Sequence, residues 1–351
     1  AALTERGITP GLGTVLVGDD PGAKSSTVPC ASEMALADLY IPILYPADSQ
    51  DILDLGVHAA LMSRTSGVWT SLKISAHVAD GASTARVDPD RIVPVFGDLG
   101  TSPHVPSGRL LGAHLMELEQ NQLTTRLPRA QEYARLNGLN RIVVSSPDDR
   151  IGIVAAGKTY LDLREALRLM RIDDDDLRRL GIRILKLGMV YPIEREILNR
   201  FMFDTATGDL DEVIVVEEKR KLIEVQIKEA IFDDRRGRRV TGWKNERGET
   251  VFTVKKALDP VKIARILDDL LAEDGVETET LIARRKILSD AVRADNASDI
   301  AVRKPWFCSG CPHNTSTRLP EGARAYAGIG CHYMVQWMDR ETNGFTHMGA
   351  E

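Results

Sequence analysis

Three cysteines and two of the three histidines in the last fifty residues have the spacing of a metal site. Cys308 and Cys311 form a C-x-x-C pair with His313 close behind, and Cys331 is followed directly by His332. A C-x-x-C turn can place two thiolates on one metal, and a third thiolate can come from another loop. Because clustered cysteines in a chain of this kind indicate metal before disulfides, we predict a metal centre here.

The residues alone leave the occupant of this centre open. Zinc would need His313 or His332 as a fourth ligand, and an iron–sulfur cluster would need one further cysteine. The only other thiol is Cys30, whose neighbours do not indicate a ligand. A redox dithiol would leave Cys331 without a partner, and Pro312 stands where c-type haem attachment needs a histidine. Chance clustering of inert cysteines is the remaining alternative.

A second candidate site lies near the start of the sequence. Residues 18–25 read G-D-D-P-G-A-K-S and approach the phosphate-binding loop G-x-x-x-x-G-K-[ST], but Ala23 replaces the second glycine. Pro29 follows five residues after Lys24, where that loop requires a helix. We therefore expect either a polar turn or a ligand-facing loop at the carboxyl end of a strand, and not a nucleotide-hydrolysing loop.

The first elements that would position these groups form a parallel α/β layer. Residues 14–17, 41–44 and 68–74 are strand-like, and Asp48 or Ser49 can cap an amphipathic helix between the second and third of them. Strand, helix, strand in this order is typical of a parallel sheet. A Pro- and Gly-rich connector is expected over 91–112, followed by mixed helix to about 137 that is interrupted near Pro128.

The clearest module is a small doubly wound sheet made of three strand–helix pairs. Residues 142–144 are also strand-like, and the pairs are 151–154 with 160–170, 182–187 with 193–203, and 213–216 with 219–231. Asp173–Asp176 is expected to be a solvated helix start. The arginines at 235, 236, 238 and 239 indicate a solvated linker or, as an alternative, an anion-binding patch.

Composition limits the classes of function. The chain has 351 residues, 43% hydrophobic and 27% charged, which fits two or three globular domains. A formal net charge of −6 argues against a protein held on nucleic acid by phosphate contacts. No apolar run reaches the length of a membrane span, so we expect a cytoplasmic protein without nucleic-acid or membrane partners.

Several motifs, in this order along the chain, resemble one enzyme family. They are residues 18–27, 45–48, 157–162, 186–190, 216–220, 308–317 and 328–334, with further matches at 337–340 and 345–349. Together they are similar to indolepyruvate ferredoxin oxidoreductase, one of the thiamine-diphosphate-dependent 2-oxoacid:ferredoxin oxidoreductases. A weaker resemblance links residues 10–22 to the opening strand of methylenetetrahydrofolate dehydrogenase/cyclohydrolase, without its tyrosine.

The main resemblance implies an α/β fold with a complete transketolase-C-terminal-like domain between two partial ones. The implied divisions are a partial pyrimidine-binding-type domain at 1–90, a connector with helices at 91–140, the transketolase-C-terminal-like domain at 141–232, a charged linker with helices at 233–302, and the start of a diphosphate-binding domain at 303–351. The activating glutamate is then expected before Ala1. The magnesium-holding Gly-Asp-Gly segment and the fourth cysteine are expected after Glu351, so the sequence is expected to be a fragment that is inactive alone.

The resemblance also implies cofactors, site residues and partners. The cofactors would be thiamine diphosphate, Mg²⁺ and a four-iron four-sulfur cluster. Cys308, Cys311 and Cys331 would ligate the cluster; His313, Ile329, Gly330 and His332 would lie near the thiamine; Ser25, Ser26 and Thr27 would face the substrate. The parent enzyme would oxidatively decarboxylate an arylpyruvate to an acyl-CoA and pass electrons to ferredoxin, as a homo-oligomer. The alternatives are a non-catalytic α/β scaffold with a zinc knuckle and, less favoured, the folate enzyme.

Overall fold

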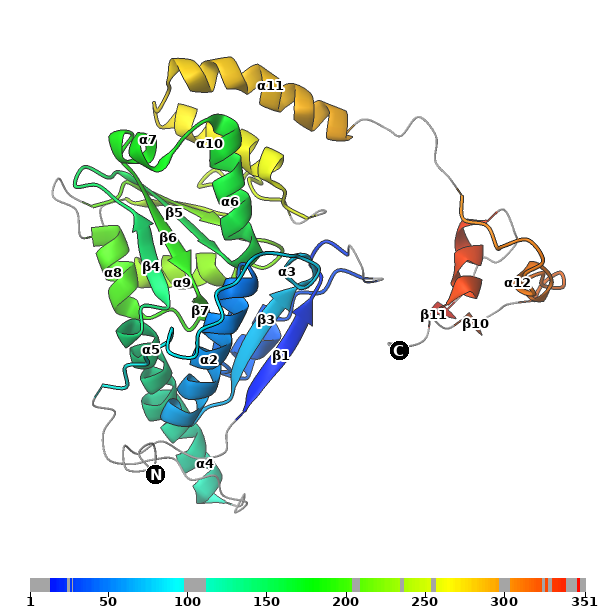
Figure 1. Ribbon diagram of the computed structural model, residues 1–351, viewed down its shortest axis with the longest axis horizontal. Coiled ribbons are helices and arrows are strands. Elements are labelled where there is room, and N and C mark those ends of the chain that lie inside the picture. Colours follow the sequence, from blue (N-terminus) through cyan, green and yellow to red (C-terminus); the bar gives the residue numbers. More distant parts are fainter. Residues whose placement is uncertain are drawn as a thin grey trace. The chain divides into compact units, whose positions relative to one another are not determined.

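The structure is a computed structural model, and the chain divides into two compact units, Ala1–Val292 and Arg293–Glu351 (Figure 1). We describe each unit by itself. The residues that the structure describes are 13–23, 26, 28–97, 112–203, 209–233, 237–253, 257–296, 304–323, 326–327, 330–338 and 346–347.

The first unit begins with a four-stranded sheet in the order β1-β3-β2-β7. Its strands are β1 (Thr14–Asp19), β2 (Ile43–Leu44), β3 (Thr70–Ser75) and β7 (Met189–Tyr191). Both β1 and β2 run parallel to β3, whereas β7 pairs antiparallel with β2. The parallel α/β layer expected at the start of the chain is therefore confirmed.

Helix α2 (Ser49–Ser66) connects β2 to β3 and begins where the sequence predicts. The side chain of Asp48 accepts a hydrogen bond from the backbone N–H of Asp51 at 2.8 Å, which satisfies one of the unpaired donors of the first turn. The helix ends at Gly67 in the left-handed conformation, with a φ of 80°. Two shorter helices, α1 (Glu33–Asp38) and α3 (Ala76–Ala79), flank the sheet strands in sequence.

The helical stretch before residue 137 changes its winding and does not break. Helix α4 (Ala113–Asn121) continues through a π-helical turn (Gln122–Arg126) into α5 (Leu127–Leu136). Pro128 lies in the first turn of α5, directly after the wider π turn. The expected interruption is thus a local π-helical irregularity, because such a turn accommodates a residue that cannot donate an ordinary helical hydrogen bond.

The second sheet has five strands in the order β4-β6-β5-β8-β9. They are β4 (Asn140–Val144), β5 (Ile151–Ala156), β6 (Ile182–Leu187), β8 (Glu212–Val216) and β9 (Arg239–Thr241). Neighbours pair in parallel except β4, which is antiparallel to β6 at the edge. One apolar core contains residues of α6 (Gly157–Met170) and α10 (Pro260–Glu273), and another contains residues of α8 (Arg195–Phe203) and α9 (Leu222–Ala230). The predicted doubly wound sheet is confirmed.

The stretch expected to be a charged linker contributes to this second sheet. Strand β9 extends the sheet, α10 covers it, and α11 (Glu279–Asn296) follows. Arg239 forms an ion pair at 2.8 Å with Glu212 and another with Asp274, and Arg238 donates a hydrogen bond at 3.1 Å to the carbonyl of Met202. These two arginines therefore stabilise the fold and are not an open anion-binding patch. The arginines at 235 and 236 lie outside the described residues.

The chain passes from the second sheet to the first at Gly188, between β6 and β7. A Cβ atom at Gly188 would lie 2.5 Å from the carbonyl oxygen of Leu139, so only glycine fits there. Asn140 Oδ1 accepts hydrogen bonds from the backbone N–H groups of Gly188 and Met189, at 3.0 and 2.9 Å. The Gly188 carbonyl accepts one from Tyr45 at 2.8 Å. The two sheets are thus joined by backbone hydrogen bonds within one unit.

The second unit is small and contains all three clustered cysteines. Its described elements are α12 (His313–Ser316), a 3-10 helix (Cys331–Trp337) and the short parallel pair β10 (Tyr326–Ala327) and β11 (Thr346–His347). Phe307, Val335 and Met338 form its buried apolar cluster. Across the described part of both units, no helix has the length and apolar character that crossing a membrane requires.

Candidate functional site

The loop that follows β1 is closed by its own aspartates. Asp20 Oδ2 accepts a hydrogen bond from the backbone N–H of Ser26 at 2.7 Å, and the Asp20 carbonyl accepts from Ala23 and Cys30 at 3.1 Å. The Asp20 N–H in turn donates to Cys30 Sγ at 3.1 Å. Asp19 accepts from both the N–H and the hydroxyl of Ser32, at 2.8 and 2.6 Å. The loop is therefore a compact turn at the carboxyl end of a parallel strand, where α/β proteins usually place ligands.

This geometry decides between the alternatives for the near-match to a phosphate loop. After the described turn at Asp20–Ala23 the next helix is α1, which starts only at Glu33. The carboxylates of Asp19 and Asp20 accept hydrogen bonds from backbone N–H groups of the segment that follows them. A phosphate-binding loop needs its N–H groups free at a helix N-terminus, so the described part of this loop favours a polar turn over a nucleotide-hydrolysing loop; Lys24 and Ser25 lie outside the described residues.

Below this loop lies a buried ionic cluster around Lys73 of β3. The Lys73 side chain is 1% exposed and forms an ion pair with Glu33 and a longer one, 3.6 Å, with Asp19. Its Nζ also lies 4.3 Å from the ring centroid of Tyr45. Burial alone would lower the pKa of Lys73, but Tyr45, Glu33 and Asp19 together raise it above its ordinary value. These partners therefore favour the charged form of Lys73.

Two carboxylates at the carboxyl end of β8 approach the same region. Burial raises the pKa of Glu217 to about 8, although the backbone N–H groups of Ile223 and Glu224 donate to it. Glu218 is buried and accepts from the Leu258 N–H at 2.8 Å. Burial also raises the pKa of the Tyr45 hydroxyl, and the Glu218 charge adds to that effect. Carboxyl ends of strands from both sheets therefore bring polar groups into one region of the first unit.

Sequence reasoning placed Asp19 and Tyr45 in two separate motifs, but it did not select Lys73 or Glu33 and did not connect these residues. One signal was present, because a lysine in the otherwise uncharged strand T-S-L-K-I-S has to be paired if the strand is buried. Its partners Glu33 and Tyr45 are separated from it by 40 and 28 positions in the sequence, and no motif connects them. Of the predicted substrate residues, Ser26 is exposed beside this loop, while Ser25 and Thr27 lie outside the described residues.

In the second unit the two cysteine-bearing segments pack against each other. Cys308 and Cys311 share one turn, in which the Cys311 N–H donates to the Cys308 carbonyl at 3.0 Å. The rings of His313 and His332 are 5.8 Å apart, which brings the Cys331 segment to the C-x-x-C turn. Cys311 is packed against the apolar cluster, and its Sγ lies 3.3 Å from Nδ1 of His313. The structure therefore brings together segments that the sequence separates by twenty residues.

The thiols themselves are not gathered into a finished centre. Cys308 and Cys331 are exposed and Cys311 is half-buried, and all are free thiols. Among the residues with described placement, no three His, Cys, Asp or Glu side chains converge closely enough to hold a metal. Gly330 has a φ of 154°, and a Cβ atom there would lie 3.1 Å from the His332 ring, so glycine allows the histidine to sit close to the backbone. Ile329 lies outside the described residues.

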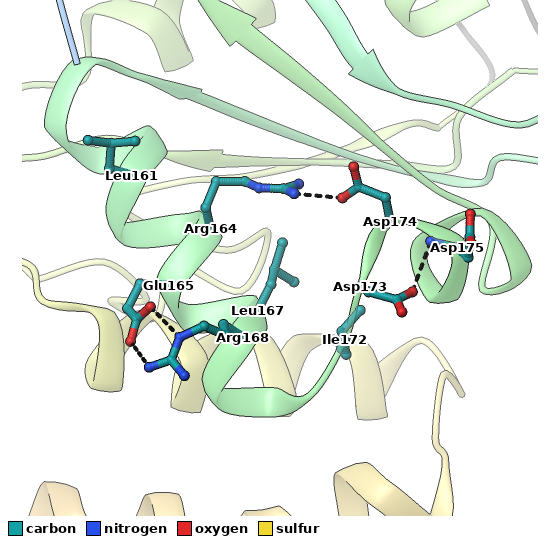
Figure 2. A pocket seen from close by; sticks show the side chains of 9 residues that line it. All are labelled: Leu161, Arg164, Glu165, Leu167, Arg168, Ile172, Asp173, Asp174 and Asp175. Atoms are coloured by element: carbon teal, nitrogen blue, oxygen red, sulfur yellow. Dashed lines mark hydrogen bonds and ion pairs between the residues drawn. The ribbon is translucent and has the colours of Figure 1, made fainter. Parts of the chain in front are cut away.

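A hollow beside α6 contains many charged groups, but they neutralise one another. Arg164 forms an ion pair with Asp174 at 2.7 Å, and Arg168 forms one with Glu165 at 2.5 Å (Figure 2). Asp173 caps α7 (Asp174–Arg179) by accepting from backbone N–H groups, and the first of these bonds, from Asp176, is the main cause of its lowered pKa. The predicted solvated helix start is confirmed, and we assign no ligand to this hollow.

Two mainly parallel sheets, with helices connecting their strands, define an α/β protein. Residues 141–295 match the family model described as the indolepyruvate oxidoreductase domain. The indolepyruvate oxidoreductase subunit IorA of Methanothermobacter marburgensis is 23% identical over 328 residues, covering 92% of this chain and 46% of that protein. The same subunit from Pyrococcus horikoshii is 25% identical over 335 residues, covering 93% and 47%. The predicted resemblance of this chain to the indolepyruvate ferredoxin oxidoreductases is confirmed by these matches.

Two further comparisons are weaker or more local. The chain spans about half the length of the curated relatives named above. A solved 2-oxoglutarate:ferredoxin oxidoreductase from Magnetococcus marinus has 11% identity and a TM-score of 0.42, over 65% of this chain and 42% of that one. Bifunctional protein FolD of Dehalococcoides mccartyi (strain CBDB1) is 29% identical over 99 residues, which is 27% of this chain and 33% of that protein.

Proposed function

We propose that this chain supplies part of a thiamine-diphosphate-dependent 2-oxoacid:ferredoxin oxidoreductase that acts on an arylpyruvate such as indolepyruvate. The match to indolepyruvate oxidoreductase subunits over more than nine-tenths of the chain is the observation that carries the proposal. In this reaction a 2-oxoacid loses carbon dioxide, its acyl group is transferred to coenzyme A, and ferredoxin accepts the electrons. The FolD match is confined to about a quarter of the chain, so the folate enzyme is not favoured.

The donor set of the second unit suits an iron–sulfur cluster. Three free thiols lie on two segments that pack together, and thiolates are the ligands that such clusters require. Cys308, Cys311 and Cys331 would hold the cluster. The exposure of Cys308 and Cys331 leaves both accessible to iron and sulfide, and packing of Cys311 against Phe307, Val335 and Met338 would restrict solvent on one side.

The histidines of this unit would serve the organic cofactor. Thiamine diphosphate, when bound, supplies the electron sink that makes decarboxylation of a 2-oxoacid feasible. His313 and His332, with Ile329 and Gly330, would lie beside it, and the lack of a Cβ atom at Gly330 leaves room for the His332 ring. Mg²⁺ would be required to hold the diphosphate. Ser25, Ser26 and Thr27 would face the substrate from the loop that Asp20 closes.

The metal assignment can be tested with the four cysteines of this chain. After anaerobic reconstitution with iron and sulfide, we expect both elements to bind in equal amounts, and the Cys308→Ser, Cys311→Ser and Cys331→Ser variants to lose them. Cys30→Ser is the matched control and should retain the iron. Cys30 lies in the first unit, where its Sγ accepts a hydrogen bond from the Asp20 N–H.

Two outcomes would contradict the assignment. If the chain bound zinc without iron, and if the His313→Ala or His332→Ala variant lost its affinity for zinc, the zinc-knuckle alternative would be supported instead. Equal loss of iron in the Cys30→Ser control would mean that binding is not specific to the clustered thiols. Activity requires a separate assay of the longer parent protein, in which indolepyruvate-dependent reduction of ferredoxin should need both coenzyme A and thiamine diphosphate.

A further inference from the structure

A basic pocket opens beside the loop that Asp20 closes, and neither the sequence motifs nor the family comparison assigns it a ligand. It has a volume of about 450 Å³, which is within the range of small-molecule sites. Its lining comes from separate parts of the chain, namely Pro29, Cys30, Ala31 and Met34 after β1, Lys219, Arg220 and Lys221 after β8, and Trp243 after β9. We propose that this pocket binds a phosphate ester that carries an apolar or planar group. The proposal does not depend on the proposed function.

The charge in the pocket is positive because the neighbouring carboxylates are engaged elsewhere. Glu217 accepts from backbone N–H groups at the start of α9, and Glu218 accepts from Leu258. Glu224 pairs with Lys228 at 2.6 Å and accepts from the Trp243 N–H at 2.8 Å. Across the described residues, neither Arg220 nor Lys221 forms an ion pair with a carboxylate.

The backbone presents these cations to the pocket in a fixed way. Lys219 has a φ of 64°, which is costly for a residue with a side chain, and the Arg220 N–H donates to the Glu218 carbonyl at 2.8 Å. The three basic residues directly precede α9, a helix of nine residues. Its first N–H groups are bonded to Glu217, so the positive charge of the pocket comes from the three basic side chains. A tight basic turn of this kind concentrates positive charge in front of one helix end.

The other lining residues favour an organic ligand over a bare anion. The Lys221 Nζ lies 5.2 Å from the ring centroid of Trp243, and Lys244 lies on the same ring at 6.0 Å. Met34, which also lines the pocket, is 50% exposed. An apolar or planar group can contact both side chains while its phosphate meets Arg220 and Lys221, because guanidinium and ammonium groups bind phosphate oxygens directly.

Calorimetry with 1-naphthyl phosphate tests this pocket, and inorganic phosphate and 1-naphthol separate its two parts. We expect 1-naphthyl phosphate to bind more tightly than either fragment probe. The Arg220→Gln/Lys221→Gln variant should weaken binding by about tenfold or more, because two charge-assisted contacts are lost. Trp243→Ala should weaken the binding of 1-naphthyl phosphate but leave the affinity for inorganic phosphate nearly unchanged.

The control is Arg86→Gln/Lys286→Gln, which removes the same charge at positions outside the pocket. It should retain the affinity of the unchanged chain within about twofold, and circular dichroism should show that all variants remain folded. Equal affinity in the pocket variant and the unchanged chain would overturn the proposal. An equal loss of affinity in the control and in the pocket variant would also overturn it, since binding would then reflect net charge alone.

Discussion

Replacing Lys73 by methionine is expected to destabilise the first unit strongly. The methionine has a similar length, but it leaves Asp19 and Glu33, whose side chains are 0% and 9% exposed, without their cation. Breaking a buried ion pair from one side costs about 3–5 kcal/mol in the free energy of unfolding, because the remaining charge stays in a poorly solvated place. We expect Lys73→Met to fall in this range.

The second substitution, Glu33→Gln, should recover part of that loss. In the doubly substituted chain both opposite charges are gone, and Asp19 keeps the N–H and hydroxyl of Ser32. Glu33 Oε2 is buried and, among the described residues, has no hydrogen-bond partner. Replacing this oxygen by the amide nitrogen of glutamine therefore removes no hydrogen bond. A double-mutant cycle should therefore give a coupling free energy of about 2 kcal/mol between positions 73 and 33.

Urea unfolding followed by circular dichroism measures this cycle. The matched control is the exposed pair of Arg150 and Asp211, 2.9 Å apart with side chains 69% and 58% exposed. The cycle Arg150→Met with Asp211→Asn should give a coupling below about 0.5 kcal/mol, because water and salt screen that pair. If the buried pair couples no more strongly than the exposed pair, burial does not govern the Lys73 cluster and the reasoning is refuted.

Three smaller perturbations test other parts of the first unit. Glu217→Gln should become more stable relative to the unchanged chain as the pH rises from 5 to 8, by up to about 1.4 kcal/mol per pH unit. The folded-state pKa of Glu217, about 8, lies above its unfolded value, so the unchanged chain loses stability as the pH rises over this window, whereas the Glu217→Gln variant does not. An equal difference between the urea midpoints of the two chains at pH 5 and pH 8 would contradict this. Asp48→Ala should lower the free energy of unfolding by about 1 kcal/mol through loss of the α2 cap, and an unchanged urea midpoint would count against that cap. Gly157→Ala should cost about 1–3 kcal/mol, since φ is 50° and the new methyl group would lie 2.5 Å from the Tyr45 ring. Gly18→Ala, with open space around it, is the control, and equal thermal shifts in the two alanine variants would refute the steric argument.

The amino-acid sequence determined the features that depend on neighbouring residues. The start of α2 follows from Asp48, a side chain that reaches an N–H only three residues away. The strand–helix pairs around β5, β6 and β8 follow from short apolar runs and amphipathic helices of the length that parallel strands need. The turn that joins Cys308 to Cys311 follows from their spacing.

Only the tertiary structure decided which distant residues share an environment. Lys73, Glu33 and Tyr45 lie on different elements, and their contact depends on the order of strands in the first sheet. The pairing of β7 with the first sheet depends on contacts of Gly188 with Asn140. The pairing of β9 with β8 depends on the path of the chain between these two strands. The basic pocket likewise needs the loop after β1 to meet the loop after β8. Local propensity contains no information on such pairings, because their free energy comes from burial and charge compensation between segments that only the completed fold brings together.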